Sequence, residues 1–113
     1  MKKIAVICNY ELLPERVGGM DYFYWLFNSE CIKNKISVTW FFPNRSNHGR
    51  YDELEIKVPE NKVSLETCFL NYCATENVSF DVVYVHFLEL CTSFYKQIKA
   101  KNSTTNLIVV DHN

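Results

Sequence analysis

Two of the three histidines end short apolar segments that have the pattern of buried strands. His86 closes the segment that begins at Asp81, and His112 closes the one that begins at Leu107. An imidazole in such a place can be a packed core group, or it can hydrogen-bond a substrate hydroxyl and stabilise charge that develops in a transition state. Because the carboxyl ends of parallel strands share one edge of a sheet, we expect both histidines at the same edge.

A glycine pair, Gly18 and Gly19, precedes the first expected helix. A backbone without Cβ atoms can approach a ligand closely and point the free N–H groups of a helix N-terminus at a phosphate, although such a pair can also be only a turn. The dinucleotide fingerprint GxGxxG and the phosphate loop GxxxxGK[ST] are both absent. A nicotinamide dehydrogenase and a nucleoside triphosphatase are therefore disfavoured.

Other patterns of catalysis and metal binding are missing from the sequence. It contains no GxSxG nucleophile elbow and no CxxC pair, and the histidines are far apart in the chain. An odd number of cysteines without a spacing framework argues against a secreted disulfide scaffold. We expect no metal site, and structural buried thiols in a reducing cytoplasm. The cysteines are Cys8, Cys31, Cys68, Cys73 and Cys91.

The composition is that of a folded domain. Apolar residues make up 48% and aromatic residues 15% of the 113 residues, which is enough to form a core. The 12 basic and 13 acidic side chains nearly cancel, whereas nucleic-acid-binding domains usually carry a basic excess. No apolar run approaches the ~20 residues of a membrane span, and the N-terminus lacks a leader pattern. We predict one domain over residues 1–113 and no nucleic-acid partner.

Five strands and three helices are expected. Continuous apolar runs predict buried strands at 4–8, 36–42, 82–87 and 107–110, and alternation at 54–58 predicts an edge strand. The stretch 44–50 is polar and is predicted to be a loop. Helices are expected over 20–34, after a Ser64 cap, and around Phe94 and Ile98.

The first helix carries more apolar surface than one buried face requires. At 100° per residue, Tyr22, Trp25 and Ile32 lie off the predicted buried face, and Asp21 favours the helix dipole without needing a further role. The residues of that predicted face are Met20, Phe23, Tyr24, Phe27 and Cys31.

Alternation of strands and helices predicts a Rossmann-like, doubly wound, mainly parallel sheet with helices on both faces. Its ligand site is expected where the strand order reverses, between the first strand and the strand at 82–87. No helix follows the last expected strand, so part of one sheet face should be bare and the chain could self-associate. We interpret the sequence as the truncated first half of a larger two-domain protein.

In order and spacing, these segments resemble the N-terminal domain of glycosyltransferases of the GT-B fold. The resemblance rests on Arg16-Val17-Gly18-Gly19-Met20, on the segment 81–87, and on Leu107-Ile-Val-Val-Asp-His112. More narrowly, the chain is similar to the retaining family that includes sucrose-synthase-like enzymes and the mannosyl- and glucosyltransferases of bacterial envelope polysaccharide assembly. The match spans essentially the whole chain.

The resemblance implies a nucleotide-sugar donor and a sugar or glycolipid acceptor, without a metal or another cofactor. In that family an N-terminal acceptor domain faces a C-terminal donor domain across a cleft. The basic pair and the paired glutamates of the donor domain have no counterpart here, so the 113 residues are predicted to be inactive alone. The implied role is polysaccharide or glycolipid synthesis in the cytoplasm, where the full-length protein could lie at the inner face of the membrane.

Residue roles follow from the same resemblance. Gly18 and Gly19 correspond to the glycine loop against the donor phosphates, and His112 corresponds to the catalytic histidine near the transferred sugar. His86 matches one histidine of a strand-end pair, and Tyr84 stands in the place of the other. The residues predicted on the acceptor side are Tyr10, Arg16, His86 and Asn113.

Two alternatives remain open. One is a flavodoxin-like or receiver-like ligand-binding domain, complete in itself. A receiver needs acidic residues at the first strand end, where Cys8 and Asn9 stand, and a flavodoxin needs a hydroxyl-rich loop where Glu-Leu-Leu-Pro-Glu occupies 11–15. The other is an interaction domain, favoured by Tyr22 and Trp25 lying off the predicted buried face of the first helix.

Overall fold

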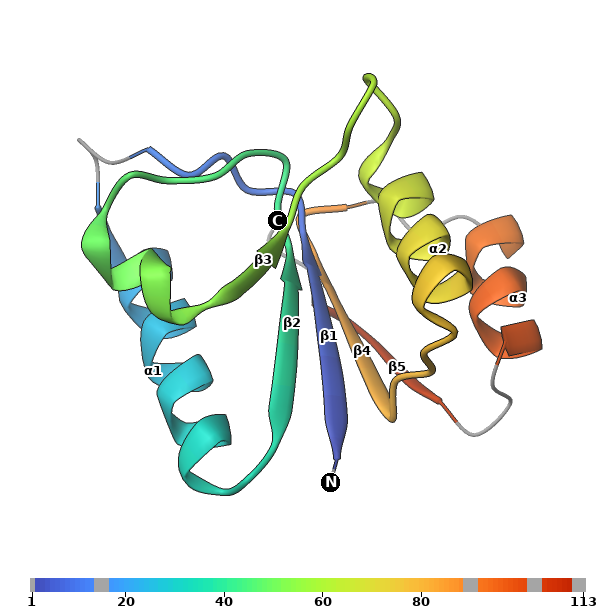
Figure 1. Ribbon diagram of the computed structural model, residues 1–113, viewed down its shortest axis with the longest axis horizontal. Helices are drawn as coiled ribbons and strands as arrows, with labels where there is room; N and C mark the ends of the chain where they lie inside the picture. Colours follow the sequence, from blue (N-terminus) through green and yellow to red (C-terminus); the bar gives the residue numbers. More distant parts are fainter. Residues whose placement is uncertain (1, 14–16, 89–91, 102–104, 111–113) are drawn as a thin grey trace.

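Strands and helices alternate along the chain, and the computed structural model describes residues 2–13, 17–88, 92–101 and 105–110 (Figure 1). All five predicted strands and all three predicted helices are present in it, and a short 3-10 helix, η1, begins inside the predicted loop. The elements are β1 (Lys3–Cys8), α1 (Gly19–Lys33), β2 (Ser37–Phe41), η1 (Gly49–Glu53), β3 (Glu55–Lys57), α2 (Leu65–Glu76), β4 (Val82–His86), α3 (Thr92–Lys101) and β5 (Asn106–Val110).

The strands form one sheet in the order β3-β2-β1-β4-β5, and every neighbouring pair is parallel. β1 pairs with β2 on one side and with β4 on the other, so that Val6 lies opposite both Trp40 and Tyr84. The predicted Rossmann-like fold is confirmed. The strand order reverses between β1 and β4, at the place predicted for a ligand site.

The helices cover opposite faces of the sheet. α1 packs on one face, and α2 and α3 lie side by side on the other (Figure 1). This follows from right-handed crossovers, because the chain first winds outward from β1 to β2 and β3 and later outward from β4 to β5. The Ser64 cap of α2 forms as predicted, with its hydroxyl accepting a hydrogen bond from the Thr67 N–H at 3.1 Å.

The predicted buried face of α1 is wrong in part. Tyr24 and Cys31 are buried as expected, but Phe23 is 47% exposed and Trp25 is buried instead. The structure also buries two polar residues of α1, Asp21 and Asn28, while Tyr22 and Ile32 are exposed as predicted. The face that meets the core is therefore rotated away from the most apolar stripe of the helix.

Partners from other elements explain that rotation. The Tyr51 hydroxyl of η1 donates to Asp21 at 2.5 Å, and the Trp40 indole N–H of β2 donates to Asn28 at 2.9 Å. Trp25 packs edge to face on Tyr51, with 5.3 Å between ring centroids. Burying a polar side chain costs free energy when it loses its hydrogen bonds to water. The hydrogen bonds to Asp21 and Asn28 offset that cost, so a face that contains polar residues can be buried.

Part of the sheet face on the α1 side carries no helix within the described residues, as the sequence predicted. Tyr84 of β4 is only half-buried, and Ile108 of β5, its register partner on the same face, is 40% exposed. Phe27 of α1 reaches Tyr84 with 5.8 Å between ring centroids, at the margin of the covered area.

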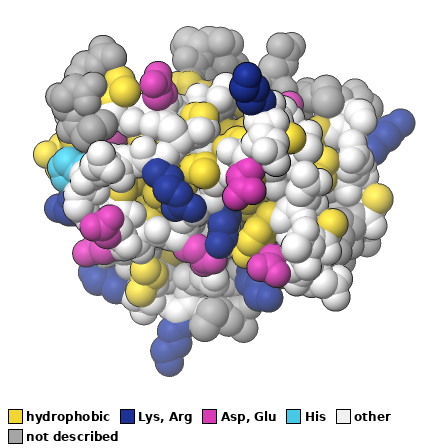
Figure 2. Space-filling view, turned by 45° about the horizontal axis from the view of Figure 1, so that its top comes forward, with side chains coloured by type: hydrophobic (Ala, Val, Ile, Leu, Met, Phe, Trp, Pro, Cys, Tyr) yellow, Lys and Arg dark blue, Asp and Glu magenta, His cyan; other side chains and the backbone are white. Residues whose placement is uncertain are grey.

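Charges of both signs are mixed on the surface. Figure 2 shows Lys and Arg side chains interspersed with Asp and Glu over the face that it displays. Lys57 on the edge strand β3 pairs with Glu55 at 3.7 Å, an exposed contact of small energetic weight. None of the described helices is long and apolar enough to cross a membrane.

Candidate functional site

The carboxyl ends of β1 and β4 meet at one edge of the sheet. The Asn9 N–H donates to the His86 carbonyl at 3.0 Å and fixes the start of the loop that follows β1. Tyr10, next in that loop, packs its ring on Phe87 with 5.7 Å between centroids. The edge is therefore built from two segments more than 70 residues apart in the chain.

Phe87, immediately after β4, has a left-handed backbone conformation with φ 57°. A bulky residue in this region costs about 1–2 kcal/mol relative to ordinary conformations. Its ring is 37% exposed and lies against Tyr10. Strained backbone of this kind concentrates at binding sites, and here it lies where the strand order reverses.

The glycine pair lies at the N-terminus of α1. Gly18 is the N-cap residue with φ −128°, an extended conformation that any residue can adopt. A Cβ atom added to Gly18 or to Gly19 would meet no atom within 4 Å. Neither backbone conformation nor packing among the described residues thus requires glycine at these two positions.

Asp21 is the centre of a buried polar network at this helix end. The carboxylate is 1% exposed and accepts hydrogen bonds from the Gly18 N–H at 2.9 Å and the Tyr51 hydroxyl at 2.5 Å. A longer contact of 3.5 Å joins it to the Tyr10 hydroxyl. A negative charge near a helix N-terminus is stabilised by the helix dipole. A phosphate bound at this helix end would lie close to the negatively charged Asp21 carboxylate and would be repelled by it. The geometry therefore favours a neutral ligand.

Cys8 ends β1 beneath the loop, in surroundings that disfavour a nucleophilic thiolate. Its Sγ lies 3.0 Å from the Tyr24 hydroxyl, and both side chains are fully buried. Burial raises the pKa of the Cys8 thiol to about 12, and burial followed by the nearby Cys8 raises the pKa of Tyr24 as well. The thiol is therefore protonated at neutral pH and packs as a small apolar group, as the sequence predicted.

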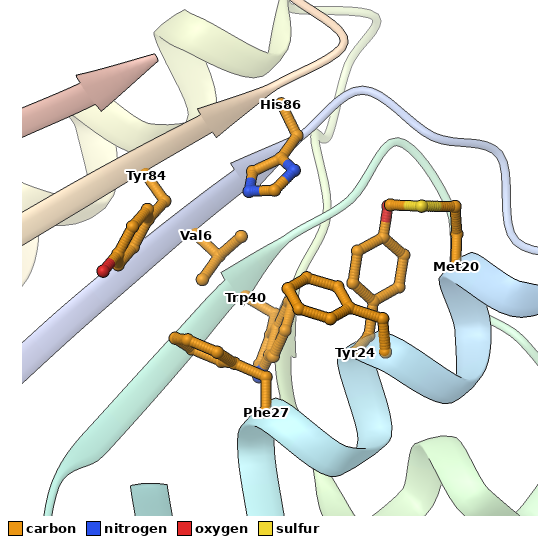
Figure 3. A pocket seen from close by; sticks show the side chains of 8 residues that line it. Val6, Met20, Tyr24, Phe27, Trp40, Tyr84 and His86 are labelled. Carbon is orange, nitrogen blue, oxygen red and sulfur yellow. The ribbon is translucent and has the colours of Figure 1, made fainter. Parts of the chain in front are cut away.

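His86 is buried, with 6% of its surface exposed, and its ring meets Tyr24 edge to face at 6.5 Å. It lies at one end of a cavity of about 360 Å³ between α1 and the sheet. Figure 3 shows strand side chains on one side of this cavity and α1 side chains on the other. The lining residues are Val6, Met20, Phe23, Tyr24, Phe27, Trp40, Tyr84 and His86.

Three of the predicted site residues gather at the carboxyl edge. Tyr10 and Gly18 meet through the Asp21 carboxylate, and Tyr10 and His86 both pack on the Tyr24 ring. Gly19 is the first residue of α1 beside them. Their roles stay predictions. Arg16, His112 and Asn113 lie outside the described residues.

Sequence reasoning missed the hydrogen-bonding roles of Asp21 and Tyr51, and it placed Phe87 at this edge without predicting its backbone conformation. The spacing of Gly18 and Asp21 matches a capping pattern, in which an acidic side chain three residues into a helix turns back to the cap, and it could have indicated the first of them. Nothing in the local sequence of Tyr51 indicates that its hydroxyl meets a carboxylate 30 residues earlier. The left-handed backbone of Phe87 has no signal in its residue type.

Metal binding finds no support in the described part of the chain. No three His, Cys, Asp or Glu side chains lie together there as a metal site would require. The thiols of Cys8, Cys31 and Cys73 are buried, Cys68 is half-buried, and these four cysteines form no disulfide. Cys91 lies outside the described residues.

The geometry can thus hold a neutral, hydroxyl-bearing group at the edge and an apolar group in the cavity beside it. Comparison of the chain with family models, with curated proteins and with solved structures found no match.

Proposed function

We propose that the chain is the acceptor-binding domain of a nucleotide-sugar-dependent glycosyltransferase of polysaccharide or glycolipid synthesis, which needs a donor-binding domain for turnover. One observation carries the proposal. Tyr10 and Gly18 of the β1–α1 connection and His86 of β4, which the resemblance assigns to the ligand cleft, lie near one another where the strand order reverses. Open α/β sheets bind their ligands at this place.

The electrostatics of the edge favour the acceptor over the donor. Asp21 is a buried carboxylate beside Gly18, and it would repel a donor phosphate while leaving a neutral sugar unaffected. Within this proposal, the glycine pair gives space to a sugar hydroxyl, and donor phosphates are held mainly by the second domain. This revises the role that the resemblance implied for Gly18 and Gly19.

Tyr10 suits contact with a sugar. Its half-buried ring offers an apolar face, and its hydroxyl is oriented by Asp21 at 3.5 Å. A ring of this kind can pack on the C–H face of a sugar while its hydroxyl takes part in the surrounding hydrogen bonds. His86 lies behind it, where an imidazole can position a group that reaches the cavity.

Binding to the 113-residue chain tests the proposal. Titration of the ¹⁵N-labelled chain with methyl glucoside and methyl mannoside should shift the amide signals of Gly18, Gly19 and Tyr10 saturably, at millimolar concentrations. Tyr10→Ala should weaken this binding at least about fivefold. Tyr95→Ala is the matched control, because Tyr95 is 43% exposed on α3, on the opposite face of the sheet.

Two results would contradict the proposal. The first is the absence of shifts at this edge with every glycoside tried, or equal weakening by the two tyrosine variants. The second is sugar transfer from a nucleotide-sugar by the 113 residues alone, because an acceptor domain without its donor domain should show no turnover.

A further inference from the structure

The cavity between α1 and the sheet has walls made almost entirely of carbon. Strand residues Val6, Trp40 and Tyr84 line the side toward the sheet, and Phe27 lines the side toward α1 (Figure 3). Phe23 of α1 also lines the cavity. Among the described residues, no Lys, Arg, Asp or Glu side chain lines it, and the Tyr84 hydroxyl points away from the other labelled side chains. Such walls cannot compensate a charged or strongly polar ligand for its lost hydration.

The rim of the cavity is accessible to solvent, whereas its floor is buried. Phe23 is 47% exposed and Tyr84 is half-buried. Val6 and Trp40 beneath them are at most 2% exposed. Apolar surface that is reachable from solvent and concave is the usual environment of a small hydrophobic ligand. A slender chain can enter without displacing the buried floor.

The position of the cavity connects it to the proposed acceptor site. His86 and Met20, at the carboxyl edge, line one end, and Phe27 and Tyr84, nearer the middle of the sheet, line the other. A ligand that lies along the cavity therefore has one end at the edge where Tyr10 and Gly18 stand. That end can be polar, and the remainder must be apolar.

Size limits the apolar part. A methylene group occupies about the volume of one water molecule in the liquid, roughly 30 Å³. The cavity of about 360 Å³, which is open on one side, consequently has room for a hydrocarbon chain of several carbons. A longer hydrocarbon would continue over the exposed face of β5, where Ile108 is 40% exposed.

We propose that this cavity binds the hydrocarbon chain of an amphiphilic acceptor, with the polar head of the acceptor at the carboxyl edge of β1 and β4. The identity of the head as a sugar rests on the proposed function above. The hydrocarbon site itself rests only on the shape and chemistry of the cavity.

Fluorescence of Trp40 gives a direct test, because Trp40 lines the cavity and Trp25 is the only other tryptophan. The probes are alkyl glucosides of two, six and eight carbons with a terminal bromine, used below their critical micelle concentrations on the Trp25→Phe chain. Bromine quenches an indole on contact. Quenching should saturate, and each added methylene should tighten binding about threefold to fourfold.

A matched pair of substitutions on α1 locates the site. Phe23 lines the cavity at 47% exposure, and Leu26, 62% exposed one turn along, does not line it. Phe23→Glu should weaken binding of the eight-carbon probe at least about tenfold, and Leu26→Glu should leave it within twofold. Both positions are exposed enough to keep the fold, which circular dichroism checks.

The outcomes separate the two proposals. Quenching that is absent or independent of chain length, or equal effects of Phe23→Glu and Leu26→Glu, would overturn the hydrocarbon site. So would a dimer in sedimentation that shields Trp40 from the probes, since a second copy would then fill the cavity. If tri(ethylene glycol) ethers bind as tightly as glucosides of equal chain length, the hydrocarbon site stands and the sugar-acceptor function loses its support.

Discussion

The two faces of the sheet are built from different chemistry. On the α2/α3 face, Phe69 packs on Phe41, Phe80 and Phe94 with ring centroids 5.2 to 6.1 Å apart. On the α1 face, the core includes a buried carboxylate, Asp21, which accepts hydrogen bonds from the N-cap of its own helix and from Tyr51 of η1. Aromatic packing dominates one face, whereas the other combines packing with a polar network.

The cavities differ in the same way. The hollow of about 400 Å³ on the α2/α3 face lies between the two helices and reaches the sheet only at Val83. The cavity on the α1 face lies directly on β1, β2 and β4 and ends at the edge where the strand order reverses. We infer that an aromatic ring deep in the α2/α3 core contributes more to stability than a ring that borders the accessible cavity of the α1 face.

The largest expected effect is a difference in stability between the faces. Phe69→Ala should lower the free energy of unfolding by about 3–5 kcal/mol, because the ring is 3% exposed among three other phenyl rings. Phe27→Ala on the α1 face should cost less than about 2 kcal/mol, since that ring already borders a cavity. Urea unfolding of both variants measures the difference, and equal losses would remove the contrast between the faces.

The next effect is a loss of stability in alkali that arises on the α1 face. The folded chain holds the Cys8 pKa at about 12, against an ordinary thiol value of 9.0, because burial disfavours the thiolate. Burial, followed by the Asp21 hydrogen bond, also raises the pKa of Tyr51. The folded state therefore keeps protons that the unfolded state releases, so stability is full below pH 9 and falls as the pH rises toward 12.

Cys8→Ala isolates the thiol part of that dependence. One such group contributes a slope of up to about 1.4 kcal/mol per pH unit, and the variant should remove it. The variant also removes the part that Cys8 contributes to the raised pKa values of Tyr24 and Tyr51, and it leaves the part that burial contributes. Cys68→Ala, at a half-buried thiol on α2, should change the slope much less. The free energy of unfolding measured by urea between pH 8 and 11 checks this. An unchanged slope for Cys8→Ala would show that the thiol titrates normally in the folded chain.

The sequence was sufficient to predict the framework that both faces share. Continuous apolar runs bounded by polar turns located the strands, and the handedness of the crossovers then placed β1 beside β4. His86 at the edge followed from the length of its apolar run. These features depend on local pattern and on chain geometry, which vary little with the details of packing.

The α1 face was predicted less well, because its arrangement depends on partners far away in the chain. Asp21 and Asn28 are buried only because Tyr51 and Trp40 bring hydrogen-bond donors to them. Phe23 is likewise exposed where no helix of the described residues covers this face of the strands β4 and β5. The periodicity of apolar residues along one helix does not indicate which part of the sheet is left uncovered. Buried polar residues and an open cavity occur together on this face. A prediction that places residues by hydrophobicity alone identifies neither feature.

The smallest expected effect compares the two tryptophans of the α1 face. The Trp40 indole N–H donates to Asn28 at 2.9 Å, so Trp40→Phe leaves a buried amide oxygen without this donor and should cost about 1–3 kcal/mol. The Trp25 indole nitrogen is buried and has no hydrogen-bond partner among the described residues. Trp25→Phe therefore removes an unpaired donor, and it loses only part of the stacking on His48 at 5.0 Å and the contact with Arg50 at 4.9 Å.

These opposing contributions should leave Trp25→Phe within about 1 kcal/mol of the parent chain. Thermal unfolding of the two variants at pH 7 compares them under identical conditions, and the same Trp→Phe exchange in both makes the loss of ring volume similar. A cost for Trp25→Phe as large as that for Trp40→Phe would mean that the Trp25 nitrogen is hydrogen-bonded in solution. In that case no buried polar side chain of the α1 face would lack a hydrogen-bond partner among the described residues. The accessible cavity would then be the main difference between the two faces.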